Sequence, residues 1–341
     1  MLGYRLAFTR YYVAMSETTE LIKALPLWEN IAQASKRIDS AFLNSPIIRH
    51  QTLDDALGCR MVSKVETINP IRSFKGRGAS LFVALLGSNN LSPLVAASVG
   101  NFGQGLAYAA GSQGRPLTIF AAISANPLKV SAMRDLGATV ILQGTDFDEA
   151  KELAREFARS TEAMMVIDGD EPSIAEGAGT IAYELTHQYV GPPLDAVLVP
   201  VGGGALVTGI GTWLKHVWPT TQVIAVAASG APAMARSWEA SARVATESVD
   251  TIADGIAVRV PDEYALRSMA ATVDDVITVD DSHIIESMRL IHQTLGLVTE
   301  PAGAVGIAAV LADKERWSNK AIGTVLCGSN IDSTHMDDWL K

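Results

Sequence analysis

Short apolar runs alternate with longer helical patterns along most of the chain, and this alternation constrains the fold more than any other feature. The runs lack the polar alternation of half-exposed strands, so they indicate strands that are buried on both faces of a parallel sheet. The sequence therefore predicts an α/β fold. The predicted strands are Arg60–Glu66, Leu94–Ser98, Leu117–Ala122, Thr139–Leu142, Met165–Ile167, Ala196–Val201, Val223–Ala227, Val276–Val279 and Thr324–Cys327.

Helical patterns fill the intervals between these strands. The clearest ones span Phe147–Arg159, Ser173–Tyr189 and Ser282–Leu295. Ser173 and Glu176 have the spacing of a capping box, in which each side chain accepts a free backbone N–H, so we expect a helix to begin there. Gly296 suits the end of the third helix, because glycine readily adopts the left-handed backbone conformation of a C-cap.

Composition and charge restrict the class of protein. The chain has 341 residues, of which 48% are hydrophobic and 19% charged, a balance that supports a large core. Its net charge of −10 and the lack of a Lys/Arg cluster exclude a nucleic-acid partner. The two cysteines, Cys59 and Cys327, are too far apart for a disulfide framework or a Cys-x-x-Cys metal site. We therefore expect a protein of a reducing compartment, the cytoplasm.

Two segments resemble targeting or membrane sequences without their defining features. Residues 1–16 contain Arg5 and Arg10 but no continuous apolar core, so we expect a loose N-terminal extension. Residues 196–214 carry no charge and are long enough to span a membrane. Because Pro200 and three consecutive glycines interrupt this stretch, it reads better as a strand, a loop and a helix, and no membrane partner is expected.

A glycine-rich loop follows three of the predicted strands, where ligands bind in parallel α/β sheets. The loops are Ser98–Gly105, Gly202–Ala205 and Cys327–Asn330. Two interpretations fit Gly202–Ala205: a cup of backbone N–H groups for a phosphate, or a tight packing turn. A dinucleotide site fits poorly, because the glycines are out of register with Gly-x-Gly-x-x-Gly and no ribose-binding acid stands out downstream.

Lys75 gives these loops a common chemical meaning. It lies in the stretch Asn69–Ser80, between an aromatic residue and a glycine and just before an apolar helical pattern. An isolated lysine at a helix start is usually a solvated surface residue. Combined with a phosphate cup, an anion-binding loop and a slot of small residues, it describes a site for pyridoxal 5′-phosphate (PLP) attached to the lysine as an imine.

These motifs, in this order, resemble the PLP enzymes of fold type II, the tryptophan synthase β-subunit-like architecture. Within that group the chain is most similar to the threonine/serine dehydratase and serine racemase branch, whose pattern includes Thr251–Arg259 and Glu300–Ala304. The resemblance runs from about Pro46 to Ile331. It implies two parallel-sheet domains: a large PLP domain formed by residues 17–92 and 169–341, and a small domain, 93–168, inserted between them. It also implies a homodimer or homotetramer.

The resemblance assigns cofactor-binding roles to individual residues. Lys75 matches the lysine that forms the Schiff base and then acts as the base on the substrate Cα, while Phe74 packs on the pyridine ring. Asn101 hydrogen-bonds the ring hydroxyl, and Cys327 faces the pyridine nitrogen. The phosphate is held by Gly202, Gly203, Gly204 and Ala205.

The same resemblance places the amino-acid substrate. Its carboxylate lies at the loop that contains Ser98, Val99 and Gly100, with Phe102 beside it. Gly255 and Glu300 line the wall of the site.

Several positions depart from the pattern of the branch. Val99 replaces the serine that racemases use as a second base, so racemase activity is not expected. Ala228 stands where the divalent-cation site of the branch has an acid, so no metal site is expected. Phe102 replaces a histidine, and Ala205 and Ser329 each replace a glycine.

The resemblance implies an ammonia-lyase that removes water and then ammonia from an L-β-hydroxy amino acid of the threonine or serine type. Three alternatives remain: a 3-hydroxyaspartate dehydratase, another β-elimination or β-replacement enzyme of this fold, and an inactive PLP-binding protein.

Overall fold

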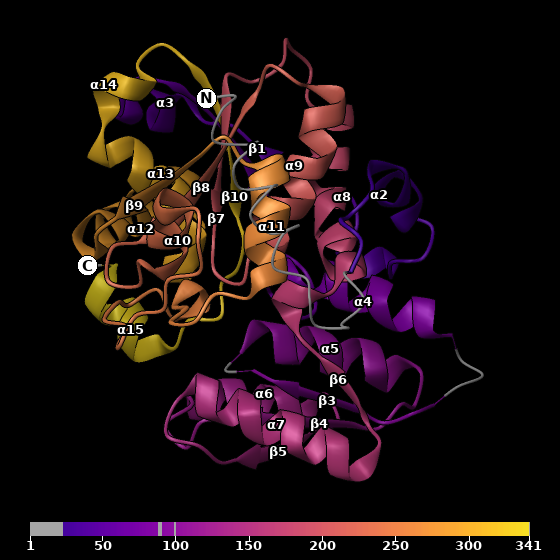
Figure 1. The fold of residues 1–341 in the computed structure, drawn as a ribbon. Helices are drawn as coiled ribbons and strands as arrows, with labels where there is room; N and C mark the ends of the chain where they lie inside the picture. Colours follow the sequence, from indigo (N-terminus) through magenta and orange to yellow (C-terminus); the bar gives the residue numbers. More distant parts are fainter. Residues whose placement is uncertain (1–22, 88–90, 99, 341) are drawn as a thin grey trace.

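The structure is a computed structural model, and it describes residues 23–87, 91–98 and 100–340. The predicted N-terminal extension and Val99 lie outside these described residues. The chain forms two groups of elements, each built on its own sheet (Figure 1). The helices are α2 (Trp28–Ala34), α3 (Gln51–Leu57), α4 (Lys75–Leu86), α5 (Asn101–Ser112), α6 (Pro127–Asp135), α7 (Phe147–Thr161), α8 (Pro172–Gln188), α9 (Ala205–Val217), α10 (Ala233–Ala240), α11 (Glu263–Thr272), α12 (Asp281–Leu295), α13 (Pro301–Ala312), α14 (Lys314–Trp317) and α15 (Ser333–Trp339).

The larger sheet has six strands in the order β1-β2-β10-β7-β8-β9. All neighbouring pairs are parallel except β1 and β2, which are antiparallel. Helix α13 packs on one face of this sheet and α9 on the other, and α8 packs against α9. The strands are β1 (Ile47–Ile48), β2 (Arg60–Val65), β10 (Ala321–Leu326), β7 (Ala196–Pro200), β8 (Gln222–Ala228) and β9 (Asp275–Val279).

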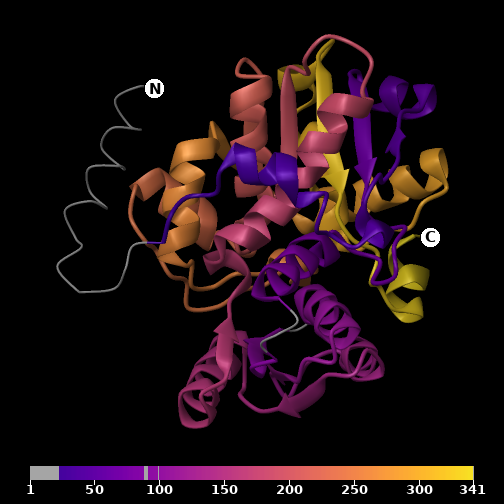
Figure 2. The ribbon, with the colours of Figure 1, turned by 90° about the vertical axis from the view of Figure 1, so that its right-hand side faces the viewer.

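The smaller sheet has four parallel strands in the order β5-β4-β3-β6. Helix α7 packs on β3 and β4, while α5 contacts β4 and α6 contacts β5. We call this group the small lobe and the rest the large lobe; Figure 2 shows the small lobe below the large one. Residues 93 and 168 were predicted as the first and last residues of the small domain, and these boundaries stay a prediction. The strands are β3 (Leu94–Ala97), β4 (Leu117–Ala121), β5 (Thr139–Leu142) and β6 (Met164–Val166).

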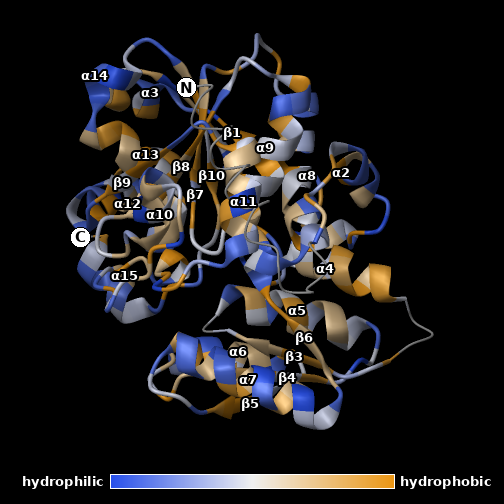
Figure 3. Cartoon of the chain, in the orientation of Figure 1, coloured by the Kyte–Doolittle hydropathy of each residue, from blue (hydrophilic) through white to orange (hydrophobic). Residues whose placement is uncertain are grey.

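Apolar strands explain both sheets. Residues of β7 and β10 are buried along their whole length, as expected for strands with helices on both faces. Figure 3 shows these strands as a hydrophobic layer between helices whose outer faces are polar. The α/β fold with two parallel-sheet units is therefore confirmed. Strand β1 was not predicted, because two apolar residues carry no periodic signal.

The two predicted helix signals had opposite outcomes. Gly296 is the left-handed C-cap of α12, as predicted, with φ 64°. The capping box was wrong: α8 begins at Pro172, and none of the side chains that the structure describes caps it. Proline lacks an N–H and suits the first helical position, so Ser173 already lies inside the helix. Glu176 instead accepts hydrogen bonds from the Leu27 N–H and the Asn30 amide.

Among the described residues, no helix is both long enough and apolar enough to cross a membrane. Residues 196–214 form β7, a glycine loop and most of α9, as predicted.

Candidate active site

A cavity of about 170 Å³ lies at the carboxyl ends of strands from both sheets, where it is lined by loops of both lobes. The structure brings together all the predicted site residues that it describes. They are Phe74, Lys75, Ser98, Gly100, Asn101, Phe102, Gly202, Gly203, Gly204, Ala205, Gly255, Glu300 and Cys327.

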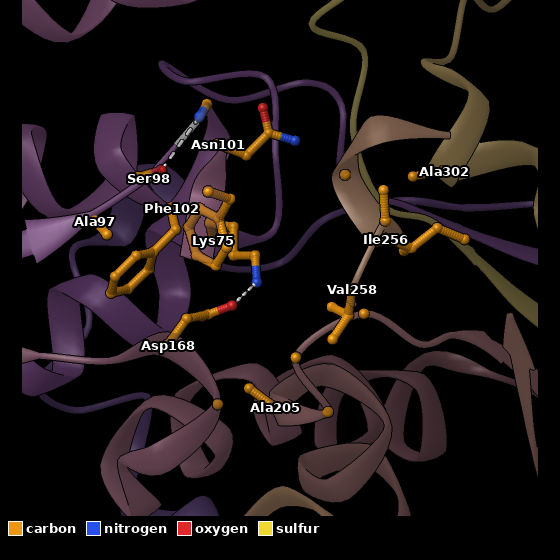
Figure 4. A pocket seen from close by; sticks show the side chains of 18 of the residues that line it. Lys75, Ala97, Ser98, Asn101, Phe102, Asp168, Ala205, Ile256, Val258 and Ala302 are labelled. Atoms are coloured by element: carbon orange, nitrogen blue, oxygen red, sulfur yellow. Dashed lines mark hydrogen bonds and ion pairs between the residues drawn. The ribbon is translucent and has the colours of Figure 1, made fainter. Parts of the chain in front are cut away.

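Lys75 is the first residue of α4, and the preceding loop fixes its position. The Phe74 N–H donates to the Cys327 carbonyl over 3.0 Å, which ties the helix start to the end of β10. A Cβ at position 76 would lie 2.1 Å from the Phe42 ring, so only glycine lets α4 pack there. The Lys75 side chain consequently extends into the cavity, with Nζ 4.7 Å from the centre of the Phe74 ring (Figure 4).

The glycine loop between β7 and α9 is a backbone cradle. Gly204 caps α9 with φ 89°, a conformation that favours glycine, and within the described part of the chain no side chain caps this helix. A Cβ at Gly202 would lie 3.0 Å from Ile256 Cα, so this part of the loop has no room for a side chain. The free N–H groups and the positive end of the α9 dipole suit an anion such as a phosphate.

The second loop joins β3 to α5 and is held together by Ser98. The Ser98 Oγ accepts hydrogen bonds from the N–H of Gly100 at 3.2 Å and of Gly103 at 2.8 Å. Its hydroxyl hydrogen is not used in either bond and can be donated to a ligand. The loop therefore offers one side-chain donor beside the N-terminus of α5.

Asn101 and Glu300 form a buried polar pair in the cavity wall. The Asn101 Nδ2 donates to Glu300 Oε1 over 2.6 Å, and the Asn330 amide donates to Asn101 Oδ1 over 2.8 Å. Burial raises the pKa of Glu300 to about 7; Lys129 opposes this increase and Asp254 adds to it. Glu300 thus titrates near neutral pH, and Asn101 keeps one amide hydrogen for a ligand. Asn330 belongs to the predicted loop Cys327–Asn330, but this hydrogen bond to Asn101 was not predicted.

Cys327 follows the last residue of β10 and is buried. Burial raises the pKa of its thiol, and the charge of Glu300 raises it further. The cavity thus contains a neutral thiol at this position.

Asp168 is another site residue whose role the sequence did not predict. It begins the short helix η2 (Asp168–Asp170), and its Oδ2 forms an ion pair with Lys75 Nζ (Figure 4). Its Oδ1 is buried without a hydrogen-bond partner among the described residues. One signal could have indicated it: Asp168 directly follows the predicted strand Met165–Ile167, as the three glycine loops follow theirs.

The family model described as "Pyridoxal-phosphate dependent enzyme" matches residues 38–328, most of the chain. The chain belongs to this family.

Individual PLP enzymes extend the comparison. The L-threonine ammonia-lyase of Thermotoga maritima is 34% identical over 310 residues, covering 91% of this chain and 77% of that protein. The L-threo-3-hydroxyaspartate ammonia-lyase of a Pseudomonas species is 29% identical over 318 residues, covering 93% and 99%. The solved structure of processed threonine deaminase isoform 2 from Solanum lycopersicum has a TM-score of 0.84 and 29% identity, and the match covers 95% of this chain and 92% of that one.

These comparisons confirm the predicted family, the PLP cofactor and the class of ammonia-lyases related to threonine dehydratase. The cavity fits the cofactor of this PLP enzyme. Lys75 provides an amine, the glycine cradle has the donors and the space for a phosphate, and the apolar ring of Phe74 borders the space between them. The neutral Cys327 thiol suits a pyridine nitrogen that carries no proton.

The mouth of the cavity in this PLP enzyme is bordered by ion pairs that connect the two lobes. The Lys129 Nζ lies 2.5 Å from Asp254 Oδ2, and the Lys151 Nζ lies 2.8 Å from Asp262 Oδ1. A third pair joins Arg259 to Asp148 over 3.0 Å. Metal binding is a separate question: among the described residues, no group of three or more His, Cys, Asp and Glu side chains is arranged to hold a metal ion.

Proposed function

We propose that this PLP enzyme removes water and then ammonia from an L-β-hydroxy amino acid of the threonine or serine type, giving a 2-oxo acid. One observation carries the proposal: Lys75 Nζ lies in one cavity with the Ser98 loop on one side and the glycine cradle on the other (Figure 4). An amino-acid lyase of this kind needs a site for the substrate carboxylate, a reactive amine and a site for the cofactor phosphate. The Ser98 loop, Lys75 and the glycine cradle supply these three groups in that spatial order.

When bound, PLP supplies an electron sink for the negative charge that develops at the substrate Cα. The chain supplies the remaining groups. Lys75 holds the cofactor, is released by the substrate amine, and takes the Cα proton at Nζ. Asn101 would hydrogen-bond the ring hydroxyl, and Phe74 would pack on the ring.

The substrate is oriented by the small lobe. The loop that contains Ser98 and Gly100 binds the α-carboxylate. Phe102 of the small lobe and Gly255 of the large lobe restrict the space beside it. Lys75 takes the Cα proton and passes a proton to the departing β-hydroxyl, so the hydrogen from Cα and the hydroxyl leave together as one water. The neutral Lys75 amine then takes the place of the substrate amine again, and an enamine leaves the site. Its hydrolysis in water yields the 2-oxo acid and ammonia.

The neutral Cys327 thiol favours elimination. It does not place a positive charge on the pyridine nitrogen, so less of the Cα charge is delocalised into the ring and the β-hydroxyl leaves more readily. Glu300 lies beside Asn101, where its protonation near pH 7 changes the charge next to the cofactor ring.

We further infer that the enzyme is a cytoplasmic homodimer or homotetramer. Two buried cysteines that form no disulfide support a reducing compartment. Light scattering of the purified protein tests the oligomeric state, and a monomer at micromolar concentration would contradict it.

The proposal is tested by mixing the PLP-loaded protein with L-threonine, L-serine and L-threo-3-hydroxyaspartate while the 2-oxo acid and ammonia are assayed. We expect equimolar products from threonine or serine. The third substrate is included because one relative is a 3-hydroxyaspartate ammonia-lyase. A protein that produces neither product from any of the three is not a lyase of this kind, and added nucleophiles would then test β-replacement.

A further inference from the structure

We propose that Asp168 is a specificity-determining residue whose carboxylate accepts a hydrogen bond from a donor on the substrate β-carbon and excludes amino acids with an anionic side chain. This inference rests on the proposed function and deepens it. It predicts that the site prefers β-hydroxy amino acids with a neutral side chain and rejects 3-hydroxyaspartate.

The position of Asp168 is fixed by close packing. The next residue, Gly169, is pressed against the glycine cradle, since a Cβ there would lie 2.2 Å from the Gly203 carbonyl oxygen. Asp168 is thus held between the cradle and Lys75. Its side chain is 21% exposed and lines the cavity.

The ion pair with Lys75 locates Asp168 relative to the reacting atoms. The substrate amine must take the place of Lys75 Nζ on the cofactor, so the substrate Cα and Cβ lie one and two bonds from that place. A carboxylate oxygen in contact with Nζ is therefore within reach of a group on Cβ. Ser98 and Asn101 lie on the other side of Lys75 in Figure 4, so the α-carboxylate and Asp168 occupy opposite sides of the substrate.

Charge pairing distinguishes Asp168 from Asp148, Asp254 and Asp262, the other aspartates at the cavity. Lys129, Lys151 and Arg259 each have a carboxylate partner of their own. The partner of Asp168 is Lys75, which must be neutral in order to take the Cα proton. During that step Asp168 carries a negative charge without a cationic partner among the described lining residues.

An unpaired carboxylate beside the substrate discriminates by charge. It accepts a hydrogen bond from a hydroxyl or amide donor. A substrate carboxylate in the same place would bring two like charges together in a partly dehydrated site, which weakens binding.

L-Asparagine and L-aspartate provide a direct test, because they have nearly the same shape, differ in side-chain charge and lack a β-hydroxyl to eliminate. Each is titrated into the PLP-loaded protein, and the dissociation constant is read from the cofactor absorbance. We expect the wild-type protein to bind asparagine at least about tenfold more tightly than aspartate, and Asp168→Asn to reduce this ratio to about twofold or less.

Asp170→Asn is the matched control. Asp170 lies in the same short helix, but it binds Lys23 on the surface at 2.8 Å and should leave the ratio unchanged. Asp168→Ser replaces Asp168→Asn if the latter does not fold. A wild-type protein without a preference for asparagine would overturn the inference, as would an Asp168 variant that keeps the full preference.

The outcome is separable from that of the proposed function. The 2-oxo acid assay with threonine and serine is run on the same preparations. Charge discrimination without elimination would refute the lyase proposal alone, whereas elimination without discrimination would refute only the role of Asp168.

Discussion

Lys75 and Arg77 lie two residues apart on α4, yet their side chains enter contrasting environments. Arg77 is fully buried, and its guanidinium donates to Glu66 at 2.8 Å and to Glu184 at 2.7 Å. Lys64 donates to the other oxygen of Glu184 over 2.7 Å. We call these four residues the interior cluster. Its two cations and two carboxylates match in number.

The groups around Lys75 are not matched in this way. One oxygen of Asp168 has no partner among the described residues, and Glu300 is held by amide groups rather than by a cation. In the interior cluster, strong pairing outweighs the cost of burial and lowers the pKa of Glu184. In the cavity, burial prevails and raises the pKa of Glu300. Complete pairing fixes α4 in place, and incomplete pairing leaves groups that can exchange protons and bind ligands.

Removing Lys75 should break the chemistry without breaking the fold. Lys75→Ala deletes the amine that holds the cofactor and takes the Cα proton, so we expect 2-oxo acid formation to fall by at least about 10⁴-fold. Thermal unfolding should change little. Lys36→Ala, at an exposed position, is the control. Turnover within tenfold of the wild type would show that another residue is the base.

Removing Arg77 should instead destabilise the fold. Arg77→Met leaves Glu66 and Glu184 buried with fewer cations, and breaking a buried ion cluster in this way costs about 3–5 kcal/mol. Denaturant unfolding measures the loss. Arg49→Met, which breaks an ion pair of an arginine that is 49% exposed, should cost less than about 1 kcal/mol. If the two variants lose equal amounts of unfolding free energy, the interior cluster is no more important for stability than a surface ion pair, contrary to this account.

Glu300 allows the comparison to be sharpened through pH. Its pKa is about 7 in the folded protein and 4.5 for the unperturbed group, so the folded state binds the proton more tightly. The stability that this provides is fully present below about pH 4.5 and is lost as the pH rises through about 7.

Glu300→Gln cannot titrate. Between pH 5 and 8 the stability of this variant should therefore rise relative to the wild type by up to about 3 kcal/mol, as measured by denaturant unfolding at each pH. Glu29→Gln, on the exposed side of α2, controls for the general effect of a lost charge. A constant difference between Glu300→Gln and the wild type across this range would mean that Glu300 is already ionised at pH 5.

A smaller effect is expected at the glycine cradle. Gly202→Ala places a Cβ 3.0 Å from Ile256 Cα and displaces the backbone donors, so PLP affinity should fall about tenfold in equilibrium dialysis. Gly191→Ala, at an exposed glycine outside the cavity, is the control and should leave PLP affinity within about twofold. If both variants lose PLP affinity to a similar extent, the glycine cradle does not hold the phosphate in the way proposed.

The sequence predicted what depends on periodicity and on position along a strand. Each of the three glycine loops follows an apolar strand, and parallel strands bring their carboxyl ends to one edge, so Lys75, Gly202 and Cys327 meet in one cavity. These relationships hold for any parallel α/β sheet and need no knowledge of side-chain packing.

The sequence did not predict pairings that are set by tertiary packing. Asp168 meets Lys75 across 93 residues of chain. Glu176 has the spacing of a capping box but binds Asn30, because Pro172 begins the helix one residue earlier than expected. Strand β1 has only two residues, and its pairing with β2 alone defines it. In each case the partner lies outside the local window in which a sequence pattern can be recognised.

The most direct test of the account is to reduce the PLP-loaded protein with borohydride, which makes the link between cofactor and lysine permanent, and to map the labelled peptide by mass spectrometry. We predict one pyridoxyl group per chain, on Lys75. A label on Lys129 or Lys151, the other lysines that line the cavity, would contradict the assignment of Lys75 as the residue that holds the cofactor.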